Sequence, residues 1–159
     1  MTRRQLFSML SAIGLAPTAA QAASKPTRPD AVELSDAEWK KRLNAAQYAV
    51  LRDEGTERAG TSELNHEKRR GVYRCAGCEL PLFSSDAKYE SGTGWPSFYE
   101  PLAGALGTKT DFKLVLPRTE YHCARCGGHQ GHVFDDGPRP TGKRYCNNGV
   151  ALRFEAAGS

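Results

Sequence analysis

The chain has 159 residues, a formal net charge of +4 at pH 7, 39% hydrophobic residues and 25% charged residues, a composition typical of a single globular domain. It contains no apolar run of the roughly 18 residues that a membrane-spanning helix needs. A chain of this length buries roughly two thirds of its unfolded surface. We therefore expect one sizeable core, no second large domain and no stable insertion into a membrane.

The segment 1–22 has the pattern of an export signal. It begins with paired arginines, continues through a weakly apolar stretch and ends in Ala-Gln-Ala, an order typical of a cleaved secretory signal peptide. The paired arginines resemble those of the twin-arginine export route, and general secretion is the alternative export route. An amphipathic N-terminal helix is the alternative, which Pro17 disfavours. We expect cleavage near Ala22 and an exported, periplasmic protein.

Cleavage at that point removes two arginines and lowers the net charge from +4 to +2. A charge this small gives little attraction to nucleic acid. The basic run 68–70 lies beside two glutamates and is interpreted as a solvated loop. We therefore expect no nucleic-acid partner, and we expect a monomer.

Two short helices are predicted after an extended linker over 23–34. A Ser-Asp-Ala-Glu sequence that starts at Ser35 is a capping box, which predicts a helix over 36–43. Asn44 can cap a second helix that ends near Gly55. The expected domain therefore starts at residue 35 and extends to residue 156.

The rest of the chain is predicted to be a long loop followed by short strands. Residues 56–70 are polar and aperiodic, which indicates a loop. From residue 71 onward, glycine and proline separate short β-like runs. These runs are 72–75, 112–116, 120–123 and 150–154. Because no run is followed by a ten-residue helical pattern, a parallel arrangement is disfavoured. We expect a mainly β fold with antiparallel strands and short N-terminal helices.

Four of the five cysteines form two matched CxxC pairs. They are Cys75 and Cys78 in one pair and Cys123 and Cys126 in the other. Two residues between cysteines let both sulfurs of a tight turn face one ion, and four thiolates suit a tetrahedral zinc ion. Iron could take its place. The alternatives are a redox CxxC of the thioredoxin sort or two disulfides. We expect one structural zinc ion that clips two hairpins together.

The fifth cysteine, Cys146, is left without a pair. A lone cysteine in an exported protein is either buried and inert or kept for its reactivity. Its neighbour Arg144 can lower the pKa of the thiol. His129 and His132 lie in a Gly-His-Gln-Gly-His-Val-Phe segment that could supply protons. This surrounding favours a reactive thiol.

Several motifs in a fixed order resemble one known family. They are Gly-Trp-Pro-Ser-Phe at 94–98, the paired CxxC turns, Gly-His-Gln-Gly-His-Val-Phe at 128–134, Asp-Gly-Pro at 136–138 and Arg-Tyr-Cys at 144–146. This order resembles the methionine-R-sulfoxide reductases of the B type, over about 35–154. The resemblance implies two antiparallel sheets, a structural zinc ion and reduction of the R epimer of methionine sulfoxide in proteins.

The resemblance also implies roles for the polar residues. Cys146 would attack the sulfoxide sulfur as a thiolate and become a sulfenic acid. His129 and His132 would surround the sulfoxide oxygen and supply its proton, because the S–O bond breaks readily only when the oxygen is protonated. Asn148 would orient this cluster, and Arg144 would favour the thiolate.

An apolar wall would complete the pocket. Trp95, which from spacing alone could equally be a core aromatic residue, would receive the methyl group of the substrate, with Phe134 as a second candidate for the same wall. Many members of the family have a resolving cysteine where this chain has Thr93. The disulfide with Cys146 cannot form here, so a thioredoxin-like protein or another external thiol is the expected reductant. Asn147, where many members have an aliphatic residue, is a smaller departure.

Two other classes of function compete with this interpretation. A zinc-clipped β fold can act as a binding module without chemistry, and a zinc ribbon can bind nucleic acid. The presence of Cys146 and both histidines favours the enzyme over the module. The export signal and the low net charge oppose the nucleic-acid binder. The expected substrates are oxidised exported proteins.

Overall fold

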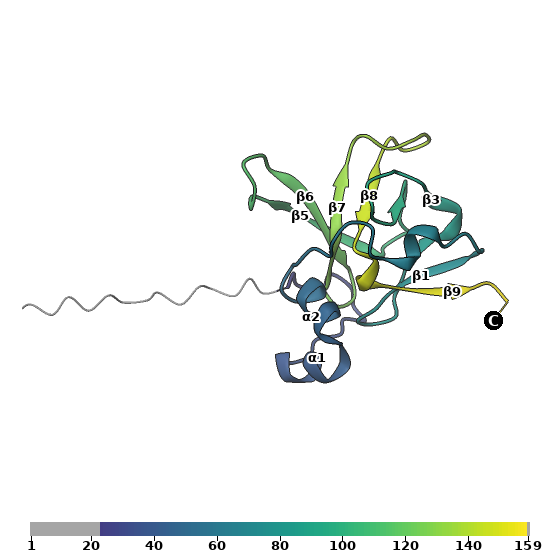
Figure 1. Ribbon diagram of the computed structural model, residues 1–159. Coiled ribbons are helices and arrows are strands. Elements are labelled where there is room, and N and C mark those ends of the chain that lie inside the picture. The colour runs from purple at the N-terminus through teal and green to yellow at the C-terminus, as the bar shows by residue number, and fades with distance from the viewer. Residues whose placement is uncertain (1–22, 159) are drawn as a thin grey trace, which may run out of the picture.

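The computed structural model describes residues 23–158 (Figure 1). Within this range the fold is mainly β, with two antiparallel sheets and two short helices, as the sequence predicts. The expected signal over 1–22 lies outside the described residues. None of the helices in the described part of the chain is long and apolar enough to cross a membrane.

Two capped helices open the domain, as predicted. Helix α1 spans Asp36–Arg42 and helix α2 spans Ala45–Leu51. Ser35 and Asn44 each form a complete capping box, in which the cap side chain and the third helical residue exchange hydrogen bonds. Helix α2 ends earlier than the expected position near Gly55. The chain then turns back, and the Gly55 amide donates to the carbonyl of Ala49, six residues earlier, at 2.8 Å.

The linker 23–34 has no regular secondary structure, yet it lies against the domain. The amide of Thr27 donates to the carbonyl of Ala124 at 2.9 Å, and Asp30 forms an ion pair with Arg125 at 2.9 Å. Ala124 and Arg125 belong to the turn between the second pair of cysteines. The linker therefore covers one of the two CxxC turns.

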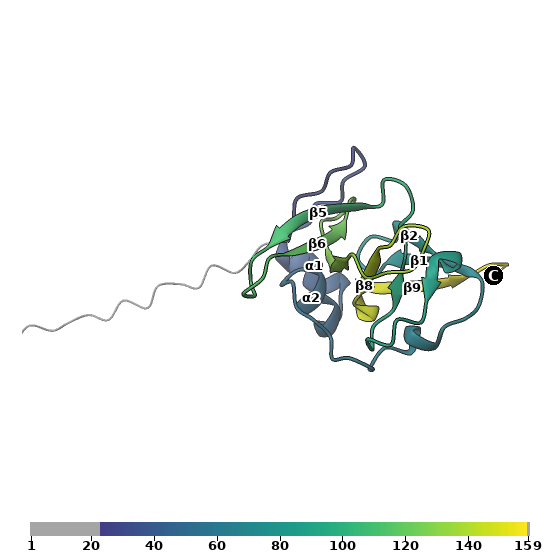
Figure 2. The same ribbon diagram turned by 90° about the horizontal axis from the view of Figure 1, so that it is seen from above.

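The strands form a three-stranded and a six-stranded sheet. The small sheet has the order β2-β1-β9 and the large sheet the order β3-β4-β8-β7-β6-β5, and every pairing is antiparallel. Figure 2 shows the small sheet on the side of the molecule opposite to the hairpin of β5 and β6. The strands are β1 (Gly71–Cys75), β2 (Pro81–Ser84), β3 (Lys88–Tyr89), β4 (Ser97–Phe98), β5 (Leu106–Asp111), β6 (Arg118–Cys123), β7 (His129–Phe134), β8 (Arg144–Asn147) and β9 (Leu152–Ala156).

The predicted strand over 112–116 is wrong. These residues form the exposed connection between β5 and β6, and Val115 is fully exposed while Phe112 is 75% exposed. The strand lies instead in the polar segment before it, where Leu106 pairs with Cys123 and the register continues to Asp111 opposite Arg118. Pairing along the whole hairpin decides the strand here, so the apolar side chains at its tip find no sheet partner.

The last strand starts two residues later than the predicted run over 150–154. Residues Gly149–Ala151 form a short 3-10 helix, η3, and β9 begins at Leu152. Within β9, Leu152 is buried, Arg153 is exposed and Phe154 is half-buried, so that alternate side chains face the core. The loop over 56–70 is irregular as predicted, apart from the 3-10 turn η1 at Glu63–His66.

An aromatic cluster holds the two sheets together. Phe83 of β2 stacks on Phe98 of β4, with ring centroids 4.1 Å apart, and Tyr73 of β1 packs edge-on against Phe98 at 4.9 Å. All three side chains are fully buried. Because β4 pairs directly with β8, this core fixes the strand that carries the lone cysteine.

Candidate active site and metal centre

The two CxxC turns meet in the fold. Cys75 ends β1 and Cys123 ends β6, and Cys78 and Cys126 lie in the turns that follow. The four sulfur atoms all lie within 4.8 Å of one another, and all four residues are buried. The Cys75 and Cys126 sulfurs are 3.7 Å apart, and those of Cys78 and Cys123 are 3.4 Å apart.

These separations fit a tetrahedral metal ion. Metal–sulfur bonds of about 2.3 Å place the sulfurs of a tetrahedron about 3.8 Å apart, whereas a disulfide needs about 2.05 Å. Gly127 follows the second pair with a φ of +69°, and a Cβ atom there would lie 1.7 Å from the Ser24 carbonyl oxygen. Glycine is therefore required where the linker packs against this turn. The cluster is compatible with a structural metal site, and the disulfide alternative is not formed in this structure.

A second site lies in a small cavity of about 120 Å³ on the large sheet. It is lined by Thr56, Trp95, Arg118, Gly131, His132, Phe134, Cys146 and Asn148. Five of the residues singled out from the sequence therefore meet in one place, although they come from three separate segments of the chain. Of the other two residues proposed for this site, Arg144 lies on the same strand as the thiol, and His129 is buried outside the lining of the cavity.

Strand pairing explains why the thiol faces a histidine. Strand β8 runs between β4 and β7, so that Cys146 lies opposite Ser97 on one side and His132 on the other. Directly opposed residues share one face of a sheet, and residues two apart on one strand do so as well. Arg144 and Phe134, which are also paired with each other, therefore lie on the same face as Cys146 and His132.

The Cys146 thiol is half-buried, and opposing effects act on its pKa. Burial raises the pKa, and this effect prevails. The charge of Arg144 and hydrogen bonds from Thr93 and Arg144 lower it. The thiol is therefore largely protonated in the free protein at neutral pH, and it needs a nearby base to act as a nucleophile.

Arg144 is held in place from two directions. Its guanidinium donates two hydrogen bonds to the Asp136 carboxylate, at 2.8 and 2.9 Å. It also lies over the ring of Phe134, 4.3 Å from the centroid. Phe134 thus serves the site in two ways, because it lines the cavity and it fixes the cation beside the thiol.

This arrangement predicts the effect of removing the cation. In Arg144→Met the pKa of the Cys146 thiol rises, because an opposite charge that favours the thiolate is lost. We expect the rate of alkylation by iodoacetamide at pH 7 to fall several-fold and the pH profile of alkylation to move to higher pH. Lys143→Met is the matched control, since that exposed side chain pairs with Asp135 instead. An unchanged profile in Arg144→Met would contradict the assignment.

His132 is oriented by a hydrogen bond to a carboxylate that the sequence analysis missed. Its Nε2 lies 2.7 Å from an Asp111 carboxylate oxygen, and the same oxygen accepts a hydrogen bond from Arg118 at 2.7 Å. Burial lowers the pKa of His132, while Asp111 opposes that shift. Burial raises the pKa of the Asp111 carboxyl. The hydrogen bonds that this carboxylate accepts lower the pKa more strongly and hold it well below its usual range. Asp111 is the last residue of β5 and belongs to no motif.

His129 is buried next to His132 and does not line the cavity. It is 2% exposed, and its Nδ1 lies 2.7 Å from Glu120, whose other oxygen contacts His122 at 3.1 Å. Burial acts upward on the pKa of Glu120, but the hydrogen bonds to the two imidazoles prevail and lower it to about 2. Within residues 23–158, no group hydrogen-bonds the buried Nε2 of His129. Its ring lies 5.5 Å from that of His132.

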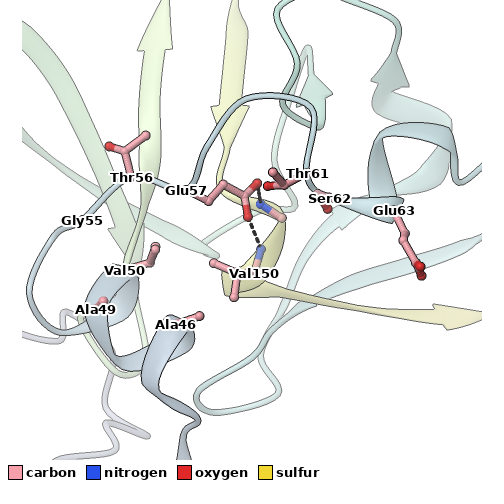
Figure 3. Close-up of a pocket in the computed structure, with 11 residues that line it drawn as sticks. Ala46, Ala49, Val50, Gly55, Thr56, Glu57, Thr61, Ser62, Glu63 and Val150 are labelled. Carbon is pink, nitrogen blue, oxygen red and sulfur yellow. Dashed lines mark hydrogen bonds between the residues drawn. The ribbon is translucent and has the colours of Figure 1, made fainter.

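Glu57, in the loop before η1, positions the part of the cavity wall that Trp95 and Asn148 form. Its carboxylate accepts hydrogen bonds from the amides of Gly149 at 2.6 Å and Val150 at 2.9 Å, as Figure 3 shows. Its carbonyl accepts from the Trp95 indole at 3.1 Å, and its amide donates to the side-chain oxygen of Asn148 at 3.0 Å. One residue of a segment with no sequence periodicity therefore positions both Trp95 and Asn148.

A half-buried thiol beside an ordered histidine, on a β fold tied together by a four-cysteine cluster, is typical of a cysteine-dependent redox protein. The family model described as "SelR domain" matches residues 43–156. A peptide methionine sulfoxide reductase MsrB of Methanosarcina barkeri is 55% identical over 126 residues, which cover 79% of this chain and 89% of that protein. The chain belongs to the SelR family of peptide methionine sulfoxide reductases of the B type.

Other relatives agree with this family. The MsrB of Leptospira interrogans is 53% identical over 78% of this chain and 95% of its own length. The chloroplastic peptide methionine sulfoxide reductase B1 of Arabidopsis thaliana is 55% identical over 77% of this chain. The match covers 61% of that protein and 58% of its rice counterpart. This chain therefore spans less than two thirds of the chloroplast proteins and nearly all of the microbial ones.

Proposed function

We propose that the chain reduces the R epimer of methionine sulfoxide in proteins to methionine. The observation that carries this proposal is the cavity in which Cys146, His132 and Trp95 meet. A nucleophile, an acid–base group and an apolar surface are what sulfoxide reduction requires. The family to which the chain belongs supports the same reaction.

The reaction is a two-electron transfer between two sulfur atoms. The Cys146 thiol gives its proton to His132 and attacks the sulfoxide sulfur, and His132 returns a proton to the oxygen as the S–O bond breaks. The attack joins the two sulfur atoms, and the released hydroxide then attacks the Cys146 sulfur. The S–S bond breaks with its electron pair going to the methionine sulfur, so that methionine leaves and Cys146 becomes a sulfenic acid. Asp111 keeps the His132 ring in place, and the ring of the buried His129 packs edge-on against it.

The choice between epimers follows from the two sides of the cavity. Trp95 and Phe134 offer apolar surface for the methyl group, and His132 and Asn148 offer a polar corner for the oxygen. The two epimers exchange these groups when the methionine chain enters from the same side. The S epimer would then place its oxygen against the aromatic rings and leave the polar corner without a partner, which is costly.

We propose zinc as the ion of the four-cysteine cluster. A closed, buried set of four thiolates is typical of structural zinc, with no open position for chemistry. Cys75, Cys78, Cys123 and Cys126 would hold the ion and thereby join the end of β1 to the end of β6. The ion supplies stability to the fold that carries the site.

We also propose an external reductant and a periplasmic location for the protein. No cysteine outside the cluster can resolve the sulfenic acid, because the chain has five cysteines in all. An external thiol, such as a thioredoxin-like protein, would therefore reduce Cys146 directly. The signal-like segment 1–22 supports export to the periplasm, where oxidised exported proteins would be the substrates of a monomeric repair enzyme.

A single-turnover experiment tests this proposal. One equivalent of substrate without reductant should yield one methionine per chain and a sulfenic acid on Cys146 that dimedone traps. Thr93 lies close enough to Cys146 to lower the pKa of its thiol, yet its hydroxyl cannot form a disulfide. Intact-mass analysis should therefore show one added oxygen or the trapped adduct.

A change at Thr93 gives the matched comparison. In Thr93→Cys the new thiol lies beside Cys146, so we expect a disulfide, the loss of two hydrogens and faster turnover with thioredoxin-type donors. A dominant disulfide in the unchanged protein, with release of metal, would instead show that a cysteine of the cluster resolves the sulfenic acid. That result would contradict the division of the five cysteines into four ligands and one nucleophile.

A further inference from the structure

A larger cavity, of about 550 Å³, lies beside the candidate active site and has no part in the proposed reaction. Figure 3 shows helix α2 on one side of it and the start of η3 on the other. Its volume lies within the roughly 300–1,000 Å³ typical of ligand-binding pockets. Ala46, Ala49 and Val50 of α2 and Val150 of η3 contribute to its lining.

The two cavities adjoin each other. Thr56 lines both, and the neighbouring residues Asn148 and Gly149 line the small and the large cavity respectively. Glu57 lies between them, because its carbonyl holds Trp95 of the small cavity and its carboxylate holds the amides of η3 in the wall of the large one. A polypeptide with one side chain in the small cavity thus reaches the large one over Thr56.

The lining of the large cavity suits an apolar side chain. The helix and η3 present methyl groups, and the carboxylate of Glu57 is already bound by the amides of Gly149 and Val150. Glu63 supplies the other carboxylate of the lining, and this side chain is exposed. Ala46 and Ala49 are exposed to solvent, so a bound apolar group would displace water from these methyl groups.

We propose that this cavity is a subsite for an apolar side chain of the substrate protein, next to the methionine sulfoxide in its sequence. The inference rests on the proposed function, because a protein substrate continues in both directions from the reacting side chain. An extended chain advances about 3.3 Å per residue and points alternate side chains to the same face, so the side chain two positions away would be directed toward the adjoining cavity. The subsite makes the enzyme prefer methionine sulfoxide within apolar segments over the free amino acid.

A peptide series tests the subsite. The peptides contain R-methionine sulfoxide and have leucine or glycine at the two positions before and after it. At one of these positions we expect leucine to lower KM by about five- to tenfold relative to glycine, because partial burial of a leucine side chain provides binding free energy of about this size. In Ala49→Trp, which fills the cavity from an exposed helix position, this preference should disappear. Ala45→Trp is the matched control, since Ala45 is exposed on the same helix but lies outside the lining.

Two further measurements distinguish peptide binding at the subsite from the chemical step at Cys146. N-acetyl methionine R-sulfoxide should be reduced at the same rate by all three proteins, because it has no neighbouring side chain. The dissociation constants of the peptides, measured by calorimetry in the Cys146→Ser background, report binding without turnover. Equal affinity for leucine and glycine peptides, or a leucine preference that Ala49→Trp retains, would overturn the subsite. Peptide binding with the predicted preference but no reduction by the unchanged protein would overturn the proposed reaction and leave the subsite standing.

Discussion

Cys146→Ser is expected to abolish the reduction of methionine sulfoxide, with a loss of at least about 10³-fold in single-turnover rate. A serine hydroxyl at neutral pH is a far weaker nucleophile than a thiolate, and its oxygen cannot be oxidised as the cysteine sulfur is when it becomes a sulfenic acid. The cavity around Cys146 offers no second thiol, because the other four cysteines belong to the buried cluster. Quenched-flow measurement of methionine formation checks this expectation.

The fold and the metal content of this variant should not change. Serine has nearly the shape of cysteine, and Cys146 takes no part in the four-cysteine cluster. Circular dichroism and elemental analysis provide the control. If Cys146→Ser retained a tenth of the single-turnover rate while binding the same amount of metal, another residue would have to be the nucleophile.

Cys78→Ser is expected to lower the metal content and the thermal stability together. The free energy of metal binding is about 10–16 kcal/mol for a structural zinc ion, and it is also folding free energy. Loss of about 5 kcal/mol of it would lower Tm by about 10–20 °C at roughly 2–4 °C per kcal/mol. The two sheets would then lose the link between the ends of β1 and β6.

Elemental analysis and a thermal melt by circular dichroism measure both quantities on the same sample. Cys146→Ser is the matched control, since it removes a cysteine outside the cluster. A purified, active protein without metal, or a Cys78→Ser variant with an unchanged melting temperature, would contradict the structural metal site.

Local patterns predicted much of the fold. The capping box at Ser35 and the cap at Asn44 predicted the helix starts, because such caps depend on residues three apart. The two CxxC turns predicted the cluster, since matched pairs of thiols with this spacing have few other uses. The family resemblance brought Trp95, His132 and Cys146 together, and the cavity contains all three.

What the sequence did not show depends on contacts between distant segments. Asp111 ends a strand whose position is set by pairing with β6, and the apolar run after it was mistaken for that strand. Its contact with His132 joins residues 21 positions apart. Glu57 bonds to η3 more than 90 positions away. Neither a spacing nor a propensity records such a contact, and only the assembled sheets bring the partners together.

The most direct measurement is the steady-state reduction of the two separated epimers of N-acetyl methionine sulfoxide, with dithiothreitol as the reductant and the product quantified by chromatography. The account predicts that the R epimer is converted to N-acetyl methionine over many turnovers and that the S epimer is left intact. In the proposed function, the apolar wall at Trp95 would receive the methyl group and the polar corner at His132 and Asn148 the oxygen, which only the R epimer would satisfy. Conversion of the S epimer, or of neither epimer, would contradict the account.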